Sequence, residues 1–299
     1  MFNIEKIIPV NPNVNFLKFK NLMLFVSSTL IIGTIILFIF KGLNLGIDFK
    51  GGILIEVKTK DTNISELRSL LKDDFNDLTI QEFGSSDNFI IRLQDQNNSN
   101  EILLINKVKS LINEKVIEFR RSEFVGPTIS QELYINGLKA ILFAIIAILI
   151  YIWFRFEWHF GFGAVLALIH DVIITLGVLS ILEIDFNLAS IAAMLTIAGY
   201  SINDTVVIFD RVRENLRKYK KLQLLELLNL SINNTLSRTV ITTLTTLIAL
   251  FSLFFLGGAV IKSFSFTMII GVLIGTYSSI FIAIPTLLLF KFRPVDEEN

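Results

Sequence analysis

The stretch FNLASIAAMLTIAGYSINDTVVIF, residues Phe186–Phe209, has a single charged side chain among its 24 residues, that of Asp204. A helix of that length extends about 36 Å, which is enough to cross the roughly 30 Å apolar core of a bilayer. A charged side chain in a membrane helix usually faces the bundle interior or a water-filled path, because lipid does not solvate it. The stretch therefore predicts a transmembrane helix, with Asp204 as the first candidate for a functional residue.

Five further stretches have the same character, and together they predict a membrane α-helical protein with six transmembrane helices. Overall, 53% of the residues are hydrophobic and 18% are charged, against about 25% charged in soluble domains. We expect Pro285 to kink the last span, because proline removes a helical hydrogen bond. The five stretches are Leu22–Phe40, Ala140–Phe154 (which Ile135–Lys139 can extend), Phe160–Leu182, Thr239–Ile261 and Ser263–Phe290.

Lysine and arginine are distributed unequally between the loops on the two sides of the predicted spans. With the N-terminus inside, thirteen basic residues lie on the inner side, whereas the short outer loops carry only Lys262. Because basic loops stay in the cytoplasm, residues 1–21 and 291–299 are predicted to be cytoplasmic. The inner residues are Lys6, Lys18, Lys20, Arg155, Arg211, Arg213, Arg217, Lys218, Lys220, Lys221, Arg238, Lys291 and Arg293.

Residues 41–134, between the first two spans, are predicted to form an extracytoplasmic domain. Their hydrophobic pattern gives the order strand, helix, strand, strand, helix, strand, which is the α+β ferredoxin-like (βαββαβ) pattern. Asn63 and Glu66 are spaced as a capping box at the start of the first helix. The acidic residues of this domain are interpreted as solvated charges, so a globular spacer is the simplest role for it. The predicted elements are about 53–57, 64–75, 78–83, 88–93, 100–115 and 116–124, with a turn at 84–87.

Residues 211–237 are predicted to form a cytoplasmic linker that is first basic and then amphipathic. Leu222, Leu225 and Leu228 give it an apolar stripe. A helix of this kind lies along a membrane surface with its basic residues near anionic headgroups. Contact with a partner protein is the alternative interpretation.

Polar side chains inside the spans are the candidates for function. Ser201, Asp204 and Thr205 follow each other at helical spacing, so they share one face of the fourth span. Arg238, at the inner start of the fifth span, can extend to the depth of Asp204. Proton coupling and a static buried pair that fixes helix packing are both compatible with this pattern. We regard Ser201, Asn203, Thr205, His170 and Asp171 as possible supporting polar groups, the last two near the middle of the third span.

Other chemistries find little support in the composition. There are no cysteines and only two histidines, so no metal site and no cofactor is predicted. The sequence has no serine–histidine or metal-ligand constellation, so we do not expect an enzyme. The formal net charge is zero, which gives no basic field for nucleic acid.

Five motifs in this chain together resemble the SecF family of bacterial protein-export subunits. The match runs from about Leu43 to Thr286 and shows no departure at the motif positions. The longest motif crosses the fourth span and is the most specific of the five. The motifs are GIDFKGG (46–52), FVGPTI (124–129), ALIHD (167–171), AGYSINDTVVIFDRVREN (198–215) and SRT (237–239).

The resemblance implies a partner, a process and a site. SecF pairs with SecD in a complex that resembles the proton-driven efflux superfamily. With the SecYEG channel and SecA, and YajC and YidC as further expected partners, it draws unfolded exported polypeptide across the bacterial inner membrane using the proton-motive force. The family's proton-coupling aspartate and arginine correspond to Asp204 and Arg238. The alternatives are half of a small-molecule exporter, or a passive scaffold for export factors.

Overall fold

Six helices are long and apolar enough to cross a membrane in the part of the chain that the structure describes, which confirms the predicted fold class. The structure is a computed structural model and describes residues 12–75, 78–83, 85–93 and 101–290. The last of the six helices continues from α9 through the π-helical turn η4 (Ser279–Ala283), α10 (Ile284–Thr286) and η5 (Leu287–Leu289). The main elements of the six are α1 (Lys20–Phe40), preceded by η2 (Phe16–Phe19), α5 (Pro127–Arg155), α6 (Trp158–Ile181), α7 (Leu188–Lys218), α8 (Leu224–Leu256) and α9 (Ala259–Ser278).

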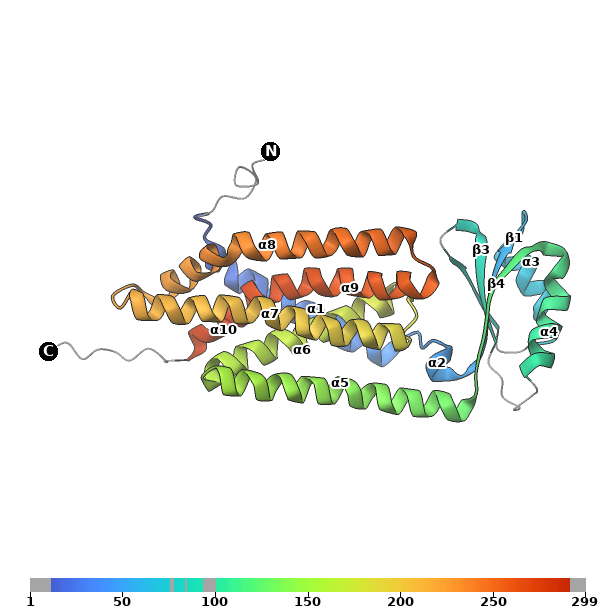
Figure 1. The fold of residues 1–299 in the computed structure, drawn as a ribbon, viewed down its shortest axis with the longest axis horizontal. Coiled ribbons are helices and arrows are strands. Elements are labelled where there is room, and N and C mark those ends of the chain that lie inside the picture. Colours follow the sequence, from blue (N-terminus) through green and yellow to red (C-terminus); the bar gives the residue numbers. More distant parts are fainter. Residues whose placement is uncertain (1–11, 76–77, 84, 94–100, 291–299) are drawn as a thin grey trace. The chain divides into compact units, whose positions relative to one another are not determined.

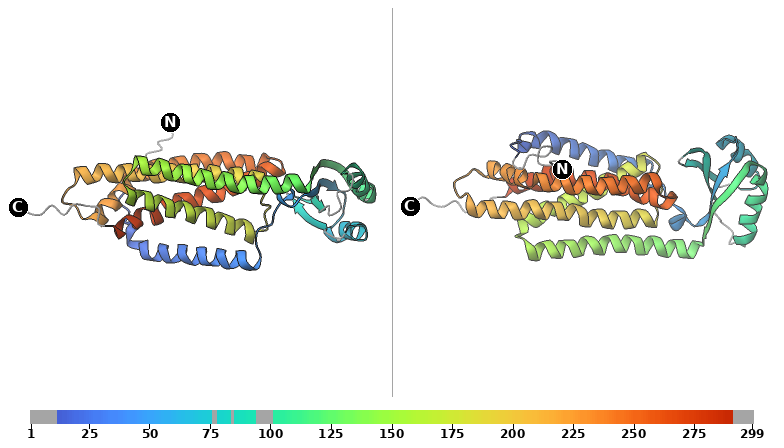
Figure 2. Two further views of the ribbon diagram at one scale, coloured as in Figure 1. Left: turned by 90° about the horizontal axis from the view of Figure 1, so that it is seen from below. Right: turned by 45° about the horizontal axis from the view of Figure 1, so that its top comes forward.

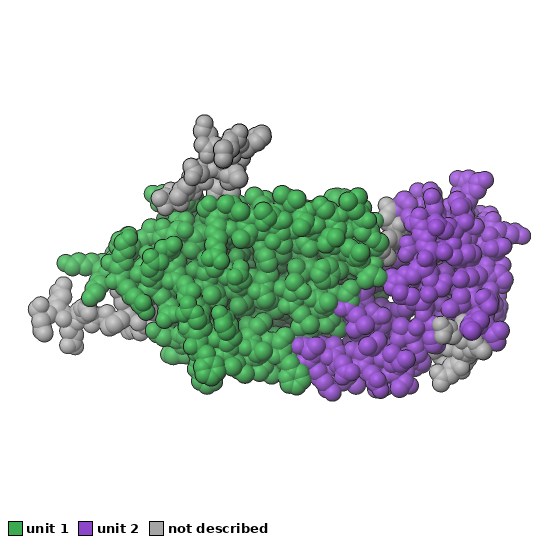
Figure 3. All heavy atoms as spheres, viewed as in Figure 1, with its two compact units in different colours: residues 1–44, 141–184, 189–299 green, residues 45–140, 185–188 purple. Residues whose placement is uncertain are grey.

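The chain divides into two compact units, which are coloured separately in Figure 3. Unit 1 comprises Met1–Asn44, Ile141–Ile184 and Ala189–Asn299, and so holds most of the membrane helices. Unit 2 comprises Leu45–Ala140 and Asp185–Leu188. Its range differs from the predicted 41–134, because it begins at Leu45 and also includes the start of α5, three residues of the loop between α6 and α7, and Leu188, the first residue of α7.

Unit 2 contains a four-stranded antiparallel sheet in the order β2-β3-β1-β4, the order of a ferredoxin-like fold. Helices α3 and α4 lie on one face of this sheet (Figure 1). The core between them is made of apolar side chains at alternate strand positions and at helical spacing, among them Ile55, Ile91, Leu67 and Val108. The elements are β1 (Gly52–Thr59), α3 (Ile64–Leu71), β2 (Leu78–Phe83), β3 (Ser85–Leu93), α4 (Glu101–Ile112), η3 (Asn113–Lys115) and β4 (Val116–Val125).

Local signals in unit 2 mostly match the sequence. The Asn63 side chain accepts a hydrogen bond from the Glu66 backbone N–H at 2.9 Å, so the predicted helix start is confirmed. The β2–β3 connection is shorter than predicted, because β3 already begins at Ser85. Gly84 lies outside the described residues.

Two glycines allow the chain to enter the sheet. After the short helix α2 (Ile47–Lys50), Gly51 has φ +74° and Gly52 has φ +111°, values that side chains with a Cβ rarely adopt. A Cβ on Gly51 would also lie 3.2 Å from the Val125 carbonyl oxygen. The glycine pair of the GIDFKGG motif is therefore required by the backbone.

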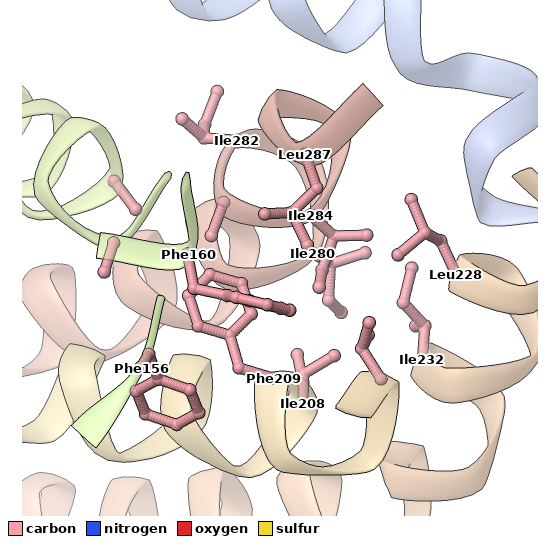
Figure 4. Close-up of a cluster of buried hydrophobic side chains, with 14 of the residues drawn as sticks. Phe156, Phe160, Ile208, Phe209, Leu228, Ile232, Ile280, Ile282, Ile284 and Leu287 are labelled. Carbon is pink, nitrogen blue, oxygen red and sulfur yellow. The ribbon is translucent and has the colours of Figure 1, made fainter. Parts of the chain in front are cut away.

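In unit 1, α6 packs against α1 and α9, and α9 also packs against α8 (Figures 1 and 2). Phe160 and Phe209 meet edge to face with their ring centroids 5.0 Å apart. Figure 4 shows these rings among side chains from α8 and from the end of the last helix, including Ile232 and Ile284. This apolar cluster fixes one end of α7, the helix that carries Asp204.

Residues 211–237 differ from the prediction. Residues 211–218 continue α7, and 224–237 form the first turns of α8. Leu227, Leu228 and Ile232 are buried in the cluster of Figure 4 instead of lying along a membrane surface. Of the predicted apolar stripe, Leu228 is buried in this cluster and Leu222 is partly buried against it, whereas Leu225 is exposed.

The last helix is irregular near Pro285, as the sequence indicates. It changes to a π-helical turn at Ser279–Ala283, which ends two residues before the proline. Proline lacks the N–H that would bond to the carbonyl one turn earlier, and a wider turn accommodates this loss.

Candidate functional site

Asp204 lies in the middle of α7 and is 3% exposed. Its Oδ2 has no hydrogen-bond partner among the described residues. The side chains that interact with the carboxylate are those of Arg238 on α8 and Thr276 on α9. A buried carboxylate oxygen without a donor is unusual, because leaving such a group unpaired costs about 1–3 kcal/mol.

Thr276 links Asp204 to two other helical groups. Its hydroxyl donates to the Val272 carbonyl at 2.9 Å and lies 2.9 Å from the Thr243 hydroxyl on α8. Because Thr276 has one hydroxyl proton, it can serve either Val272 or Asp204 at a given moment. The surroundings of Asp204 can therefore rearrange by the rotation of one hydroxyl.

Arg238 is close enough to Asp204 to attract it, but the two do not form a direct ion pair. Among the described residues, no nitrogen of Arg238 lies within 4.0 Å of a carboxylate oxygen. Arg238 is exposed on the surface of α8, whereas Asp204 faces the bundle interior. The arrangement is thus a long-range charge interaction in which only one of the two groups is desolvated.

The other polar groups of α7 fall on two sides of the helix. Ser201 and Thr205 are each 1% exposed and lie on the buried face with Asp204. The Thr205 hydroxyl, like Asp204 Oδ2, has no partner among the described residues. Asn203 is exposed on the other side of the helix, away from this buried face.

Asp171 on α6 forms a second polar centre. It is completely buried and has a partner at each oxygen. Its Oδ1 lies 2.9 Å from His170 Nδ1, and its Oδ2 accepts hydrogen bonds from Ser201 at 2.5 Å and Ser278 at 2.8 Å. Ser201 thus connects this centre to α7, three residues before Asp204.

Sequence reasoning did not identify three members of the second centre, which are Ser27, Tyr277 and Ser278. They come from α1 and α9, far from Asp171 in the chain. The run Tyr277-Ser278-Ser279 inside an apolar span was the available signal.

The end of α7 carries a charged cluster. Arg155 donates to both oxygens of Asp210, at 2.8 and 2.9 Å, and Arg213 lies over the Phe156 ring. Farther along the helix, the Asn215 amide donates to Ser231 on α8 at 2.9 Å. The polar half of the long α7 motif therefore ties α7 to the end of α5 and to α8. Within the described ranges, no three His, Asp or Glu side chains are grouped so that they could hold a metal ion.

Comparison with known proteins identifies the family. Residues 105–293 match the family model described as "Protein export membrane protein SecD/SecF, C-terminal", and residues 36–62 match "SecD/SecF GG Motif". The chain belongs to the SecF family. The second match contains Gly51 and Gly52, the residues that the backbone requires at the start of β1.

Relatives and solved structures agree with this assignment. Protein translocase subunit SecF of Rickettsia rickettsii (strain Sheila Smith) is 44% identical over 301 residues, covering 98% of this chain and 97% of the relative. That of Rickettsia bellii (strain OSU 85-389) is 45% identical, with 98% of each chain covered. The crystal structure of SecDF, a translocon-associated membrane protein from Thermus thermophilus, matches with a TM-score of 0.85 and 36% identity.

The SecDF match covers 94% of this chain but 39% of the SecDF chain. A crystal structure of SecDF in a super-membrane-facing form has a TM-score of 0.67 and 34% identity, with 93% and 39% covered. The chain therefore spans about two fifths of the SecDF chains that it matches.

Proposed function

We propose that this SecF-family chain acts with a SecD-like chain to use the proton-motive force in Sec-dependent protein translocation. The observation that supports this most directly is Asp204, a buried carboxylate in a membrane helix with one oxygen unpaired. Ionisable groups are rare in such helices and are retained mainly where ions or protons move. A transport function explains the group better than a purely structural one.

In this proposal, the proton changes the attraction between Asp204 and Arg238. Protonation removes the charge of Asp204, so Arg238 is no longer held toward α7 and the Thr276 hydroxyl is free to stay on Val272. One charge that crosses 100 mV supplies about 2.3 kcal/mol, which shifts a conformational equilibrium about fifty-fold. That is sufficient to drive a movement that assists translocation.

The surface proposed to bind the SecD-like chain is an exposed polar surface of α7 and α8. Polar side chains rarely face lipid, and small residues allow helices to approach closely. We therefore propose that membrane helices of a SecD-like chain cover this surface. The exposed residues are Ala192, Thr196, Gly199 and Asn203 on α7, and Arg238 and Thr245 on α8.

The remaining assignments follow from the family and from the charge distribution. We propose that the chain is located in the bacterial inner membrane with both termini in the cytoplasm, in agreement with the basic inner loops. SecYEG, SecA, YajC, YidC and an unfolded exported polypeptide are its proposed partners. The passive scaffold is the remaining alternative.

The proposal is tested by reconstituting the complex and measuring polypeptide translocation with and without a proton gradient. Asp204→Asn should abolish the stimulation by the gradient and leave ATP-driven translocation by SecA unchanged. Asp210→Asn, the same substitution at the charged end of α7, is the matched control and should retain the stimulation. Full stimulation in Asp204→Asn would support the scaffold instead.

Arg238→Met separates coupling from assembly. Arg238 is one of several exposed residues of the surface proposed to bind the SecD-like chain, so its loss alone should reduce gradient stimulation while the complex with the SecD-like chain still co-purifies. If the SecD-like chain is lost from the purified complex, Arg238 serves assembly and not coupling.

A further inference from the structure

A row of hydrogen bonds joins α6 to α1 and α9 through His170. His170 Nδ1 lies 2.9 Å from Asp171 Oδ1, and Nε2 lies 3.2 Å from Ser27 Oγ. Ser27 Oγ is 2.9 Å from the Tyr277 hydroxyl. Tyr277 donates to the backbone carbonyl of Met23 at 2.9 Å. The row thus begins at a carboxylate and ends at a carbonyl, a group that only accepts.

The last member of the row determines its direction. Tyr277 has one hydroxyl proton, which it gives to Met23, so its oxygen accepts from Ser27. Ser27 also has one hydroxyl proton, so its own oxygen accepts from His170. With this direction of the row, His170 Nε2 carries a proton.

A protonated Nε2 requires a second proton on the other side of the ring. A neutral histidine with its proton on Nε2 would turn a bare Nδ1 toward Asp171, and two acceptors would then face each other at 2.9 Å. A proton on His170 Nδ1 or on Asp171 Oδ1 removes this conflict, because one of the two atoms then donates. We propose that His170 and Asp171 together bind one exchangeable proton, forming a proton-binding site in the helix bundle that is distinct from Asp204.

Burial and charge support the site. His170 is 2% exposed and Asp171 is fully buried, and with the shared proton the pair has no net charge. Among the described residues, no lysine or arginine pairs with Asp171 to neutralise it in another way. A net charge buried without such a partner is costly.

The neighbouring helices offer few other groups that titrate. Those near the pair are Tyr277 on α9 and, one turn beyond Ser201 on α7, Asp204. Between residues 21 and 40, α1 has no charged side chain, and the charged residue of α9, Lys262, lies sixteen positions before Ser278.

Loss of the proton would reverse the whole row. Nδ1 would keep its proton for Asp171, and Nε2 would accept from Ser27. Ser27 would then accept from Tyr277, whose hydroxyl would leave the Met23 carbonyl. Occupancy of the site is thereby linked to a contact between α9 and α1, whether or not Asp204 carries the coupled proton.

The test uses the fact that the chain has two histidines, His159 and His170. In His159→Gln, solid-state NMR of the ¹⁵N-histidine-labelled full chain in lipid bilayers reports on His170 alone. We expect Nε2 to be protonated at low pH and to lose its proton in one transition as the pH rises. An Nε2 that is unprotonated at every pH would overturn the proposal, and so would one that stays protonated at every pH at which the chain is folded.

Tyr277→Phe provides a second, conservative test. It keeps the ring that stacks on His170 and removes only the hydroxyl that orients Ser27. The midpoint of the transition should fall, because the proton on Nε2 loses the support of the row. Tyr200→Phe is the control, since the Tyr200 hydroxyl has no partner among the described residues, and it should leave the midpoint unchanged. An unchanged midpoint in Tyr277→Phe would overturn the proposed direction of the row.

Discussion

Asp171 and Asp204 are both buried in the membrane helices, but their surroundings differ. Asp171 has partners on both oxygens, supplied by three helices, whereas one oxygen of Asp204 has none within the described part of the chain. A change of protonation at Asp171 must reorganise a whole row of hydrogen bonds, and at Asp204 it affects little beyond one threonine and a distant arginine. The surroundings of Asp171 therefore favour a fixed structure, and those of Asp204 favour rapid exchange of the proton.

The largest expected effect is on stability at Asp171. Asp171→Ala leaves His170, Ser201 and Ser278 without their shared acceptor, so we expect a loss of about 3 kcal/mol. Unfolding of the purified chain in detergent, followed by circular dichroism, measures it. A loss below about 1 kcal/mol would mean that Asp171 contributes no more to stability than we expect for Asp204, and would contradict the comparison.

A smaller loss is expected where α9 approaches α7. A Cβ on Gly275 would lie 3.0 Å from Ser201 Cβ, which is too close, so Gly275→Ala should displace Ser201 from Asp171 and cost about 1–2 kcal/mol. Gly33→Ala on α1, with nothing within 4 Å of the new methyl group, is the matched control in the same unfolding assay. Equal stability of the two variants would show that the Ser201 contact is dispensable.

Asp185, in unit 2 and outside the spans, is a half-buried carboxylate that pairs with Arg92. Burial raises its pKa, although Arg92 and Lys50 act in the opposite direction. The folded state therefore binds this proton more tightly than the unfolded state. The stability that this proton gives to the folded state is present below the ordinary aspartate pKa of about 3.9. It is lost as the pH rises through the raised pKa of Asp185.

Asp185→Asn should remove this part of the pH dependence. Thermal unfolding of the full chain across that pH window measures it. The same pH dependence in wild type and variant would exclude Asp185 as its source.

The smallest effect on stability is expected at Asp204. Asp204→Asn keeps the shape of the side chain, and Oδ2 has no hydrogen bond to lose within the described residues, so the change should stay within about 0.5 kcal/mol. The unfolding assay used for Asp171→Ala provides the comparison. A loss as large as that of Asp171→Ala would show that Asp204 is a packing residue.

Much of the fold was predictable from the sequence, because span length and strand alternation are local properties. Asp204 was found for the same reason, as one charge in an apolar run. The row from His170 to Tyr277 was not found, because its members lie more than 100 residues apart and single hydroxyl residues are common in membrane helices. The linker prediction at 211–237 differed from the structure because an apolar stripe suits a membrane surface and a helix bundle equally well.

The central claim is that Asp204 carries the coupled proton, and proton movement itself tests it most directly. The complex with a SecD-like chain is reconstituted into vesicles that enclose a pH-sensitive dye, and a proton gradient is imposed. We expect wild type to admit protons faster than vesicles without protein, and Asp204→Asn to match the protein-free rate. Proton entry at the wild-type rate in Asp204→Asn would contradict the claim.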